Sequence, residues 1–173
     1  MNNWYIITGA PCSGKTTTLQ ALAKQGHKVI YEVARTYIDE QLKLGNSLAE
    51  IRKDELLFQK KILQYKIDIE KTHLKKNTIF FERGIPDSVA YYNLCGVHDD
   101  KDLQKAVDSC RYRTIFLLHP LPYKKDYART ESEKEVQQLH YLLKESYIKA
   151  GMPITEIPVM SIQKRVALIL SLL

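Results

Sequence analysis

Residues 9–16 read Gly9-Ala10-Pro11-Cys12-Ser13-Gly14-Lys15-Thr16, a full match to the phosphate-binding pattern GxxxxGK[ST]. An apolar run at 5–8 precedes this motif, and apolar residues at helical spacing follow it, which is the strand–loop–helix context that the motif requires. Glycines allow backbone N–H groups to converge on phosphate oxygens at the N-terminus of a helix. The sequence therefore predicts a loop that binds the phosphates of ATP, with GTP left open.

Each part of this loop has an expected role. We expect Lys15 to reach the β- and γ-phosphates and to act in catalysis from a solvated position, and Thr16 to ligate Mg²⁺. Cys12 stands at a variable position of the motif, so we expect it to pack or to show mild reactivity rather than to act in catalysis. The other residues assigned to nucleotide binding are Gly9, Ala10, Pro11, Ser13, Gly14 and Thr17.

Short apolar runs typical of buried strands alternate with helical segments along the whole chain. The expected strands are 5–8, 28–31, 78–81, 114–118 and 154–157. The expected helices are 15–25, 33–44, 47–74, 87–94, 100–110, 132–150 and one that begins at 161. Apolar strands joined by helices indicate a parallel sheet covered on both faces. No repeat or linker interrupts the pattern, so we expect one α/β domain over residues 1–173.

Composition excludes several other classes of protein. The chain has 173 residues and only three cysteines, which form no CxxC pair and no ligand set with the five histidines, so a reducing compartment is favoured. No basic leader precedes the first apolar run, and no apolar stretch approaches the ~20 residues of a membrane span. We therefore expect a cytoplasmic protein. The net charge of +6 would attract any polyanion, but without a long basic block it favours a small phosphate compound over nucleic acid. The oligomeric state is left open.

Charged residues follow two of the expected strands. Ligands of open parallel sheets bind beyond the carboxyl ends of the strands. Glu82 and Arg83 end the third strand, so Glu82 is predicted to hold the metal with Thr16, and Arg83 to act on the acceptor and in catalysis. The alternative is an ion pair at the surface.

Glu32 and Arg35 follow the second strand on the same edge. Glu32 could accept the proton of an attacking hydroxyl, and Arg35, one helical turn further on, could hold a negative group of the acceptor. The alternative is a glutamate that only favours the dipole at the start of a helix.

Residues 120–132 are rich in proline, tyrosine and charge, which is the composition of a lid over a triphosphate. Arg129 is the lid residue expected to neutralise charge on the transferred phosphoryl group. The alternative is a solvated basic loop. His119, which comes just before this segment, either faces the site or is a hydrogen-bonded structural histidine.

Three segments carry a resemblance to a known family: Gly-Ala-Pro-Cys-Ser-Gly-Lys-Thr at 9–16, Tyr-Glu-Val-Ala-Arg at 31–35 and Phe-Phe-Glu-Arg-Gly-Ile-Pro-Asp-Ser-Val-Ala-Tyr-Tyr at 80–92. They resemble the small AAA-type ATPase and kinase family that includes the kinase domain of bacterial nicotinamide riboside kinases. The resemblance runs over nearly the whole chain and implies a kinase-type P-loop fold, a three-layer α/β/α sandwich with a five-stranded parallel sheet in the order 2-3-1-4-5.

A looser similarity connects the chain to the deoxyribonucleoside kinases. In that family a glutamate after the second strand is the general base, which matches Glu32. A Glu-Arg-Ser motif after the third strand positions metal and acceptor, which matches Glu82 and Arg83, but this chain has Gly84 in place of the serine. The similarity therefore implies the arrangement of the catalytic residues more than it implies the identity of the substrate.

The main hypothesis from the sequence is an ATP- and Mg²⁺-dependent kinase that phosphorylates a hydroxyl of a nucleoside- or nucleotide-like molecule. One alternative is a regulatory AAA-type ATPase or nucleotide-dependent switch with no small-molecule acceptor. Another is a polynucleotide-end kinase that uses the basic surface, which would show strongly salt-dependent oligonucleotide binding.

Overall fold

The computed structural model describes residues 3–73, 76–121 and 133–173. Its strands are β1 (Trp4–Thr8), β2 (Lys28–Ile30), β3 (Ile79–Glu82), β4 (Thr114–Leu118) and β5 (Ile154–Ile157). Its helices are α1 (Lys15–Lys24), α2 (Val33–Lys43), α3 (Leu48–Ile51), α4 (Glu55–Thr72), α5 (Asp87–Leu94), α6 (Lys101–Ser109), α7 (Glu133–Lys149) and α8 (Ile162–Ser171). The strands pair in parallel in the order β2-β3-β1-β4-β5, which confirms the predicted α/β class and strand order.

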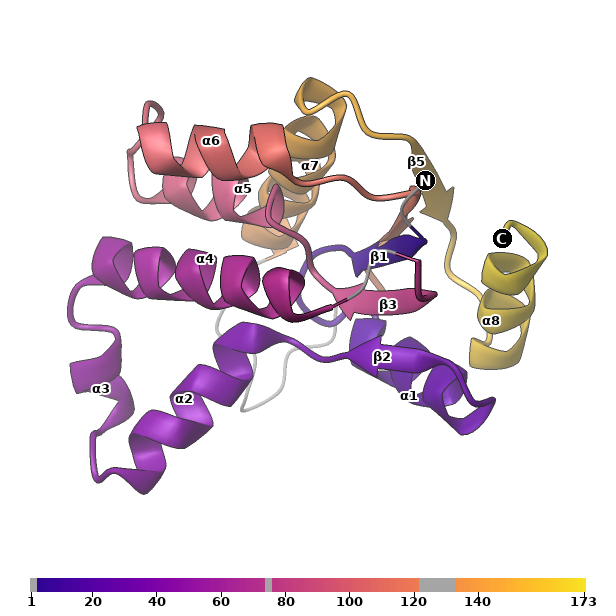
Figure 1. Cartoon of the computed structure of the whole chain (residues 1–173), viewed down its shortest axis with the longest axis horizontal. Coiled ribbons are helices and arrows are strands. Elements are labelled where there is room, and N and C mark those ends of the chain that lie inside the picture. Colours follow the sequence, from indigo (N-terminus) through magenta and orange to yellow (C-terminus); the bar gives the residue numbers. More distant parts are fainter. Residues whose placement is uncertain (1–2, 74–75, 122–132) are drawn as a thin grey trace.

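Helices cover both faces of the sheet (Figure 1). Successive side chains of a strand point to opposite faces, so β1 divides its residues between two cores. Trp4 and Ile6 join the core formed with α4, α5, α6 and α7. Tyr5 and Ile7 join the core formed with α1 and α8. These are the three layers that uninterrupted apolar strands predict.

The helix predicted over 47–74 is wrong in one respect, because α3 and α4 are separate helices. The capping box at Ser47 opens α3, as the sequence predicts. The break follows because Asp54 accepts a hydrogen bond from the backbone N–H of Leu57 at 2.9 Å and so caps a second helix. The predicted end at Leu74 lies outside the described residues. In Figure 1, α2 and α3 extend away from the sheet.

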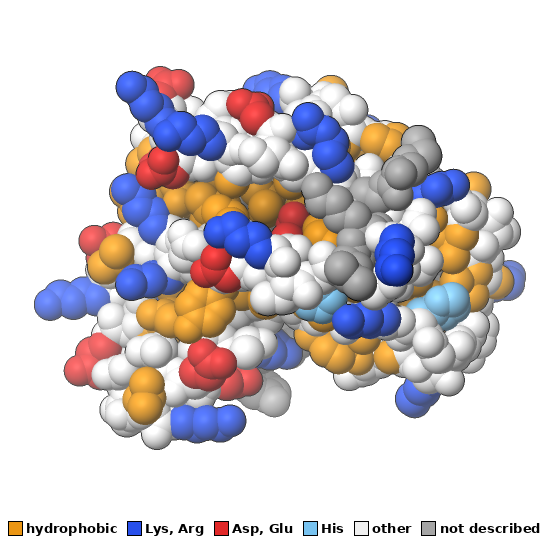
Figure 2. Space-filling view, viewed as in Figure 1, with side chains coloured by type: hydrophobic (Ala, Val, Ile, Leu, Met, Phe, Trp, Pro, Cys, Tyr) orange, Lys and Arg blue, Asp and Glu red, His pale blue; other side chains and the backbone are white. Residues whose placement is uncertain are grey.

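Surface charge is mixed in sign. On the face shown in Figure 2, lysine and arginine side chains are spread among aspartates and glutamates instead of forming one basic area. Within the described ranges, no helix combines the length and the apolar composition needed to cross a bilayer. The net charge of +6 therefore does not identify a polyanion-binding surface on this face.

Candidate active site

The loop between β1 and α1 has a conformation that depends on its glycines. Gly14 precedes α1 with φ of 84°, in the left-handed region that side chains other than glycine rarely adopt. Gly9 has φ of 143°, and a Cβ built there would lie 2.5 Å from the carbonyl oxygen of Leu118 on β4. The loop therefore packs against the end of a neighbouring strand, and its backbone N–H groups lie at the N-terminus of α1.

Lys15 is buried, contrary to the expectation of a solvated position. Its side chain folds back over the loop, where Nζ donates to the carbonyl oxygen of Ala10 at 2.9 Å. Burial, and next the charge of Arg83, lower the pKa of Lys15 to about 8, although Glu32 and Glu82 act in the opposite direction. Among the described residues the ammonium forms no ion pair with a carboxylate, so it could exchange its contacts with the Ala10 carbonyl and the Ser13 hydroxyl for a phosphate.

Thr16 and Glu82 meet at the carboxyl edge of the sheet. The Thr16 hydroxyl donates to Glu82 Oε1 at 2.7 Å, and Glu82 is only 3% exposed at the end of β3. A hydroxyl and a carboxylate are the hard oxygen donors that Mg²⁺ prefers. The two residues predicted to hold Mg²⁺ are thus adjacent and of suitable chemistry. Thr17, predicted to bind the nucleotide, is exposed in the first turn of α1.

Arg83 connects the ends of β2 and β3. Its Nε donates to Glu32 Oε1 at 2.8 Å, its Nη1 donates to Asp87 Oδ1 at 3.2 Å, and its guanidinium lies 5.3 Å from the ring centre of Tyr91. The side chain is 6% exposed, whereas that of Glu32 is 30% exposed. Burial would raise the pKa of Glu32, but the cations of Arg83 and Lys15 outweigh it and lower that pKa. Glu32 is therefore an ionised carboxylate held by an arginine.

Asp87 is a buried residue that the sequence analysis did not single out. Its carboxylate is 0% exposed and accepts hydrogen bonds from the Thr8 and Tyr147 hydroxyls and, at 2.9 Å, from the Gly84 N–H. Together with Arg83, these donors fix the turn after β3. The available signal was the opposite charge of Arg83 four residues earlier, although Arg83 precedes α5 with φ of 67° and is not part of the helix.

The structure gives a physical reason for Gly84, where the deoxyribonucleoside kinase motif has serine. A Cβ at Gly84 would lie 2.9 Å from the Tyr147 hydroxyl oxygen and 3.0 Å from the Tyr112 ring. The backbone there is further tied to α4, because buried Lys66 donates to the Gly84 carbonyl at 2.9 Å and to Ser88 Oγ at 3.0 Å. Two tyrosines thus occupy the space that a side chain at residue 84 would need.

A hollow of about 230 Å³, here called the α2 hollow, lies beside Thr16 and Glu82. Its lining residues are Thr16, Gln20, Tyr31, Glu32, Arg35, Thr36, Asp39 and Glu82. Arg35 is exposed and makes no hydrogen bond or ion pair with any described residue, so its guanidinium is available to a ligand. The structure thus brings the predicted metal pair together with Glu32 and Arg35 around one space.

A second hollow, the α7 hollow, lies on the other side of the phosphate loop and has a volume of about 370 Å³. Its lining residues are Pro11, Cys12, His119, Pro120, Leu121, Glu133, Val136, Gln137, His140 and Val159. His119 lines this space and is also hydrogen bonded to Glu156, so it combines the two roles that the sequence left open. Of the predicted lid at 120–132, residues 122–132, including Arg129, lie outside the described residues.

Arg165 on α8 lies behind the phosphate loop and was not predicted. It is 1% exposed, and its Nη1 donates to the Ser13 carbonyl oxygen at 2.8 Å. Its Nε and Nη2 are buried and have no hydrogen-bond partner within the described part of the chain. Burial lowers the pKa of Arg165. A guanidinium that has no carboxylate partner among the described residues thus lies directly against the loop that is expected to hold phosphates.

Comparison with known proteins agrees with this architecture. A family model described as an AAA domain matches residues 4–165. A search of curated proteins found no significant match to the sequence. Similar solved structures include deoxyadenosine kinase from M. mycoides with bound dCTP, with a TM-score of 0.64 and 16% identity over 97% of each chain.

Two further structures are similar over nearly the whole of this chain. Thymidylate kinase from Ehrlichia chaffeensis has a TM-score of 0.66 and 15% identity over 98% of this chain and 97% of that chain. The NadR protein in complex with NAD and AMP-PNP has a TM-score of 0.70 and 16% identity over 99% of this chain but only 48% of NadR. This chain therefore corresponds in fold to about half of NadR, and identities this low show a shared fold.

Proposed function

The chain belongs to the AAA domain family, and on that premise we propose that it is a kinase that transfers the γ-phosphate of ATP to a hydroxyl group of a nucleoside- or nucleotide-like acceptor, with Mg²⁺ as cofactor. The observation that carries this proposal is the α2 hollow. The two predicted Mg²⁺ ligands, half-buried Thr16 and buried Glu82, share that hollow with the carboxylate of Glu32. A phosphate-binding loop thus has, on one side, a small space with a base and an exposed cation.

The donor would bind along the loop at residues 9–16 and the N-terminus of α1. Lys15 would leave the Ala10 carbonyl for the β- and γ-phosphates, and the desolvated ammonium would gain a strong anionic partner. The α7 hollow, which begins at Pro11 and Cys12, is large enough for the rest of a nucleotide. We propose ATP as the donor, and we expect the protein to act in the cytoplasm, where ATP is available.

Thr16 and Glu82 would hold Mg²⁺, either directly or through its water molecules. When bound, Mg²⁺ would neutralise charge on the β- and γ-phosphates. Glu82 is suited to this role because it is buried at the end of a rigid strand and its Oε1 already lies 2.7 Å from the Thr16 hydroxyl. Removing the Thr16 hydroxyl or the Glu82 carboxylate should therefore weaken the metal dependence of turnover.

Glu32 would orient the acceptor hydroxyl and accept its proton. The ion pair with Arg83 fixes the carboxylate and lowers its pKa, which makes Glu32 a weaker base than a free glutamate. A weak base is sufficient if the transition state of phosphoryl transfer is loose, because the hydroxyl then loses its proton late. Positioning of the hydroxyl is therefore the larger part of the role that we assign to Glu32.

Three observations support the proposed acceptor class. The volume of the α2 hollow, about 230 Å³, suits a small molecule better than a polymer, which argues against the polynucleotide-end kinase. Its lining offers a cation at Arg35 and a carboxylate at Asp39, one turn apart on α2, which could bind acidic and polar groups of the acceptor. Nucleoside and nucleotide kinases among the similar structures support a nucleoside-like acceptor.

A screen for acceptor-dependent turnover tests the proposal. The protein is incubated with ATP and Mg²⁺ and a panel of nucleosides, nucleotides and vitamins, while ADP release is followed by a coupled assay and products by ³¹P NMR. We expect at least one acceptor to stimulate ADP release and to give a new phosphomonoester signal. Slow release of inorganic phosphate that no acceptor stimulates would instead favour the regulatory ATPase or switch.

A further inference from the structure

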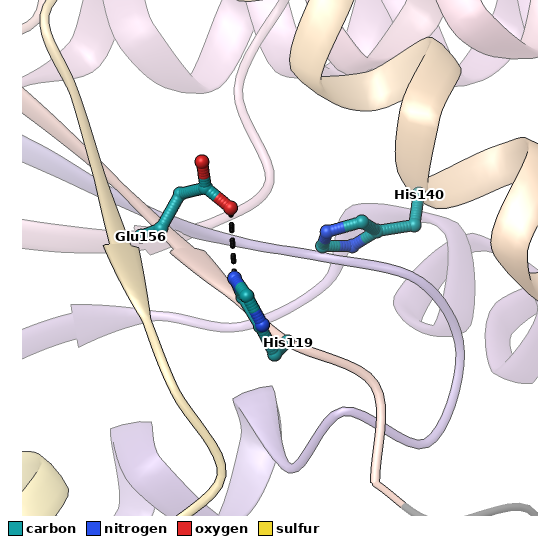
Figure 3. A group of neighbouring side chains, drawn as sticks. All are labelled: His119, His140 and Glu156. Carbon is teal, nitrogen blue, oxygen red and sulfur yellow. Dashed lines mark hydrogen bonds and ion pairs between the residues drawn. The ribbon is translucent and has the colours of Figure 1, made fainter.

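Three side chains from separate elements meet beside α7. His119 follows β4, Glu156 lies on β5 and His140 lies on α7, and the three point toward one another (Figure 3). Their nitrogen and oxygen ligand atoms all lie within 4.8 Å of one another. His119 Nε2 and Glu156 Oε2 are 2.7 Å apart, and the ring centres of His119 and His140 are 5.5 Å apart. These three residues are called the His–Glu cluster below.

We propose that the His–Glu cluster is a binding site for a transition-metal ion of the Zn²⁺ class. Two imidazole nitrogens and one carboxylate oxygen form a ligand set that zinc uses when it keeps a fourth position open. Bonds of about 2.0–2.2 Å in a tetrahedral site put the ligand atoms roughly 3.4 Å apart, so small side-chain rotations would complete the site. Mg²⁺ prefers oxygen ligands, which distinguishes this cluster from the Thr16–Glu82 pair.

The hydrogen bonding of the cluster suits a metal. His140 Nδ1 is buried and has no hydrogen-bond partner within residues 3–73, 76–121 and 133–173. His119 Nε2 and Glu156 Oε2 already lie 2.7 Å apart, so a metal bound between them would take the place of their hydrogen bond. The metal would thus satisfy a buried nitrogen that lacks a partner in the protein.

Lys144 supports the carboxylate from outside the cluster. It lies one turn after His140 on α7 and donates from Nζ to Glu156 Oε1 at 2.6 Å, which leaves Oε2 to the metal. Contacts of this kind orient a ligating carboxylate and contribute to metal affinity. The positive charge of Lys144 also repels the metal ion, so we expect the metal to bind reversibly.

The open coordination position would be reached from the α7 hollow. His119 and His140 both line that hollow, together with Pro11 and Cys12 of the phosphate loop. Water or a ligand group entering the hollow could complete the coordination. The metal could bind whether or not the protein is a kinase, because the His–Glu cluster belongs neither to the phosphate loop nor to the α2 hollow. The α7 hollow would be shared, since the rest of the nucleotide is proposed to lie there.

Metal binding is measured with Zn²⁺ alone, without nucleotide, by competition with a chromophoric chelator and by calorimetry. We expect one equivalent of Zn²⁺ to bind to the wild-type protein. His140→Gln and Glu156→Gln should each weaken binding at least about tenfold, since even loss of a residue that orients a ligand costs 10–100-fold. His98→Gln is the matched control, because His98 is an exposed histidine outside the cluster and its loss should leave affinity unchanged. Circular dichroism and thermal unfolding check that each variant is folded.

Two more variants separate the cluster from other sites of metal binding. Cys12→Ser removes the thiol that lines the same hollow, and Glu82→Gln removes the predicted Mg²⁺ ligand; both should keep wild-type Zn²⁺ affinity. Absence of stoichiometric Zn²⁺ binding would overturn the inference. So would equal Zn²⁺ affinity in His140→Gln and the wild-type protein, or loss of binding in Cys12→Ser or Glu82→Gln alone.

Discussion

The guanidinium of Arg83 and the carboxylate of Glu32, which are 51 residues apart in the sequence, form a 2.8 Å ion pair between Nε and Oε1. The pair joins the end of β3 to the start of α2 at the edge of the α2 hollow. Arg83 also donates to buried Asp87, so one cation holds two carboxylates. Arg83 therefore positions Glu32 through a network that also stabilises the turn after β3.

Arg83→Met should destabilise the protein by about 3–5 kcal/mol, the usual cost of removing one partner of a buried ion pair. The variant would leave Asp87 buried without its cation. Chemical denaturation monitored by circular dichroism measures the free energy of unfolding. Arg35→Met is the control, because it removes the same charge from an exposed site and should change stability by less than about 0.5 kcal/mol. Equal losses in the two variants would contradict the buried network.

Triphosphate binding should weaken as the pH rises through the pKa of Lys15, which burial lowers to about 8. The charged form, present below that pKa, binds phosphate, and the neutral form above it does not. For a group with a pKa of about 8 in the free protein, the Kd for ATP should rise about tenfold between pH 7 and pH 9.

Calorimetric titration at several pH values measures this dependence. Lys15→Arg should bind ATP more weakly but with a flat profile over the same range, because a guanidinium stays protonated. A wild-type profile as flat as that of the variant would show that Lys15 is not the titrating group.

Arg165→Met should weaken ATP binding about tenfold, the equivalent of one hydrogen bond made by a charged group. The positive charge against Ser13 lacks a carboxylate partner within the described residues, so we expect bound phosphates to act as its counter-ion across the loop. Stability of the free protein should fall little or even rise, since the variant removes a desolvated cation. Lys164→Met, which changes the same charge at an exposed neighbouring position, should leave the Kd for ATP unchanged. Equal Kd values for the two variants would show that Arg165 packs against the loop without contributing to ATP binding.

The fold could be predicted from the sequence because the sequence features that indicate it are local. The glycine loop, the apolar runs and the helical spacing each lie within about ten residues, and together they predict a parallel sheet covered on both faces. The strand order came from the family resemblance, and the structure confirms it. The separation of α3 from α4 was missed because the N-capping role of Asp54, within the charged run at 52–55, was not recognised.

Only some residues of the candidate site could be predicted from the sequence. Glu32 and Glu82 could be selected because each follows an apolar strand at the carboxyl edge of a parallel sheet. Arg165 could not be selected, because its contact with Ser13 spans 152 residues and depends on how α8 packs beside α1. The burial of Lys15 was missed for a similar reason, since motif spacing does not report how the side chain folds back onto Ala10.

Arg129→Ala should lower kcat more than it raises the KM for ATP, because a lid arginine acts mainly on charge that develops in the transition state. Arg129 lies outside the described residues, so this prediction rests on the sequence. Steady-state kinetics with the acceptor found in the screen measure both constants. An unchanged kcat would instead favour the alternative, in which Arg129 belongs to a solvated basic loop.

Glu32 and Glu82 should be separable by substitution. Glu82→Gln removes a charge beside Thr16 and should weaken metal dependence, acceptor-stimulated turnover and basal ATP hydrolysis together. Glu32→Gln keeps the shape of the side chain and should leave Mg·ATP affinity nearly intact. It should reduce phosphoryl transfer by the roughly 10²–10⁴ expected for a general base, nearer the lower end because Arg83 already makes Glu32 a weak base.

The rate of phosphoryl transfer to the acceptor by Glu32→Gln, compared with its rate of ATP hydrolysis without acceptor, tests the kinase assignment most directly. We predict that transfer falls at least about 100-fold relative to the wild-type protein while basal hydrolysis and Mg·ATP affinity change little. A Glu32→Gln variant that matches the wild-type protein in every rate, with no acceptor stimulating either protein, would contradict the kinase assignment and leave only a nucleotide-binding AAA domain.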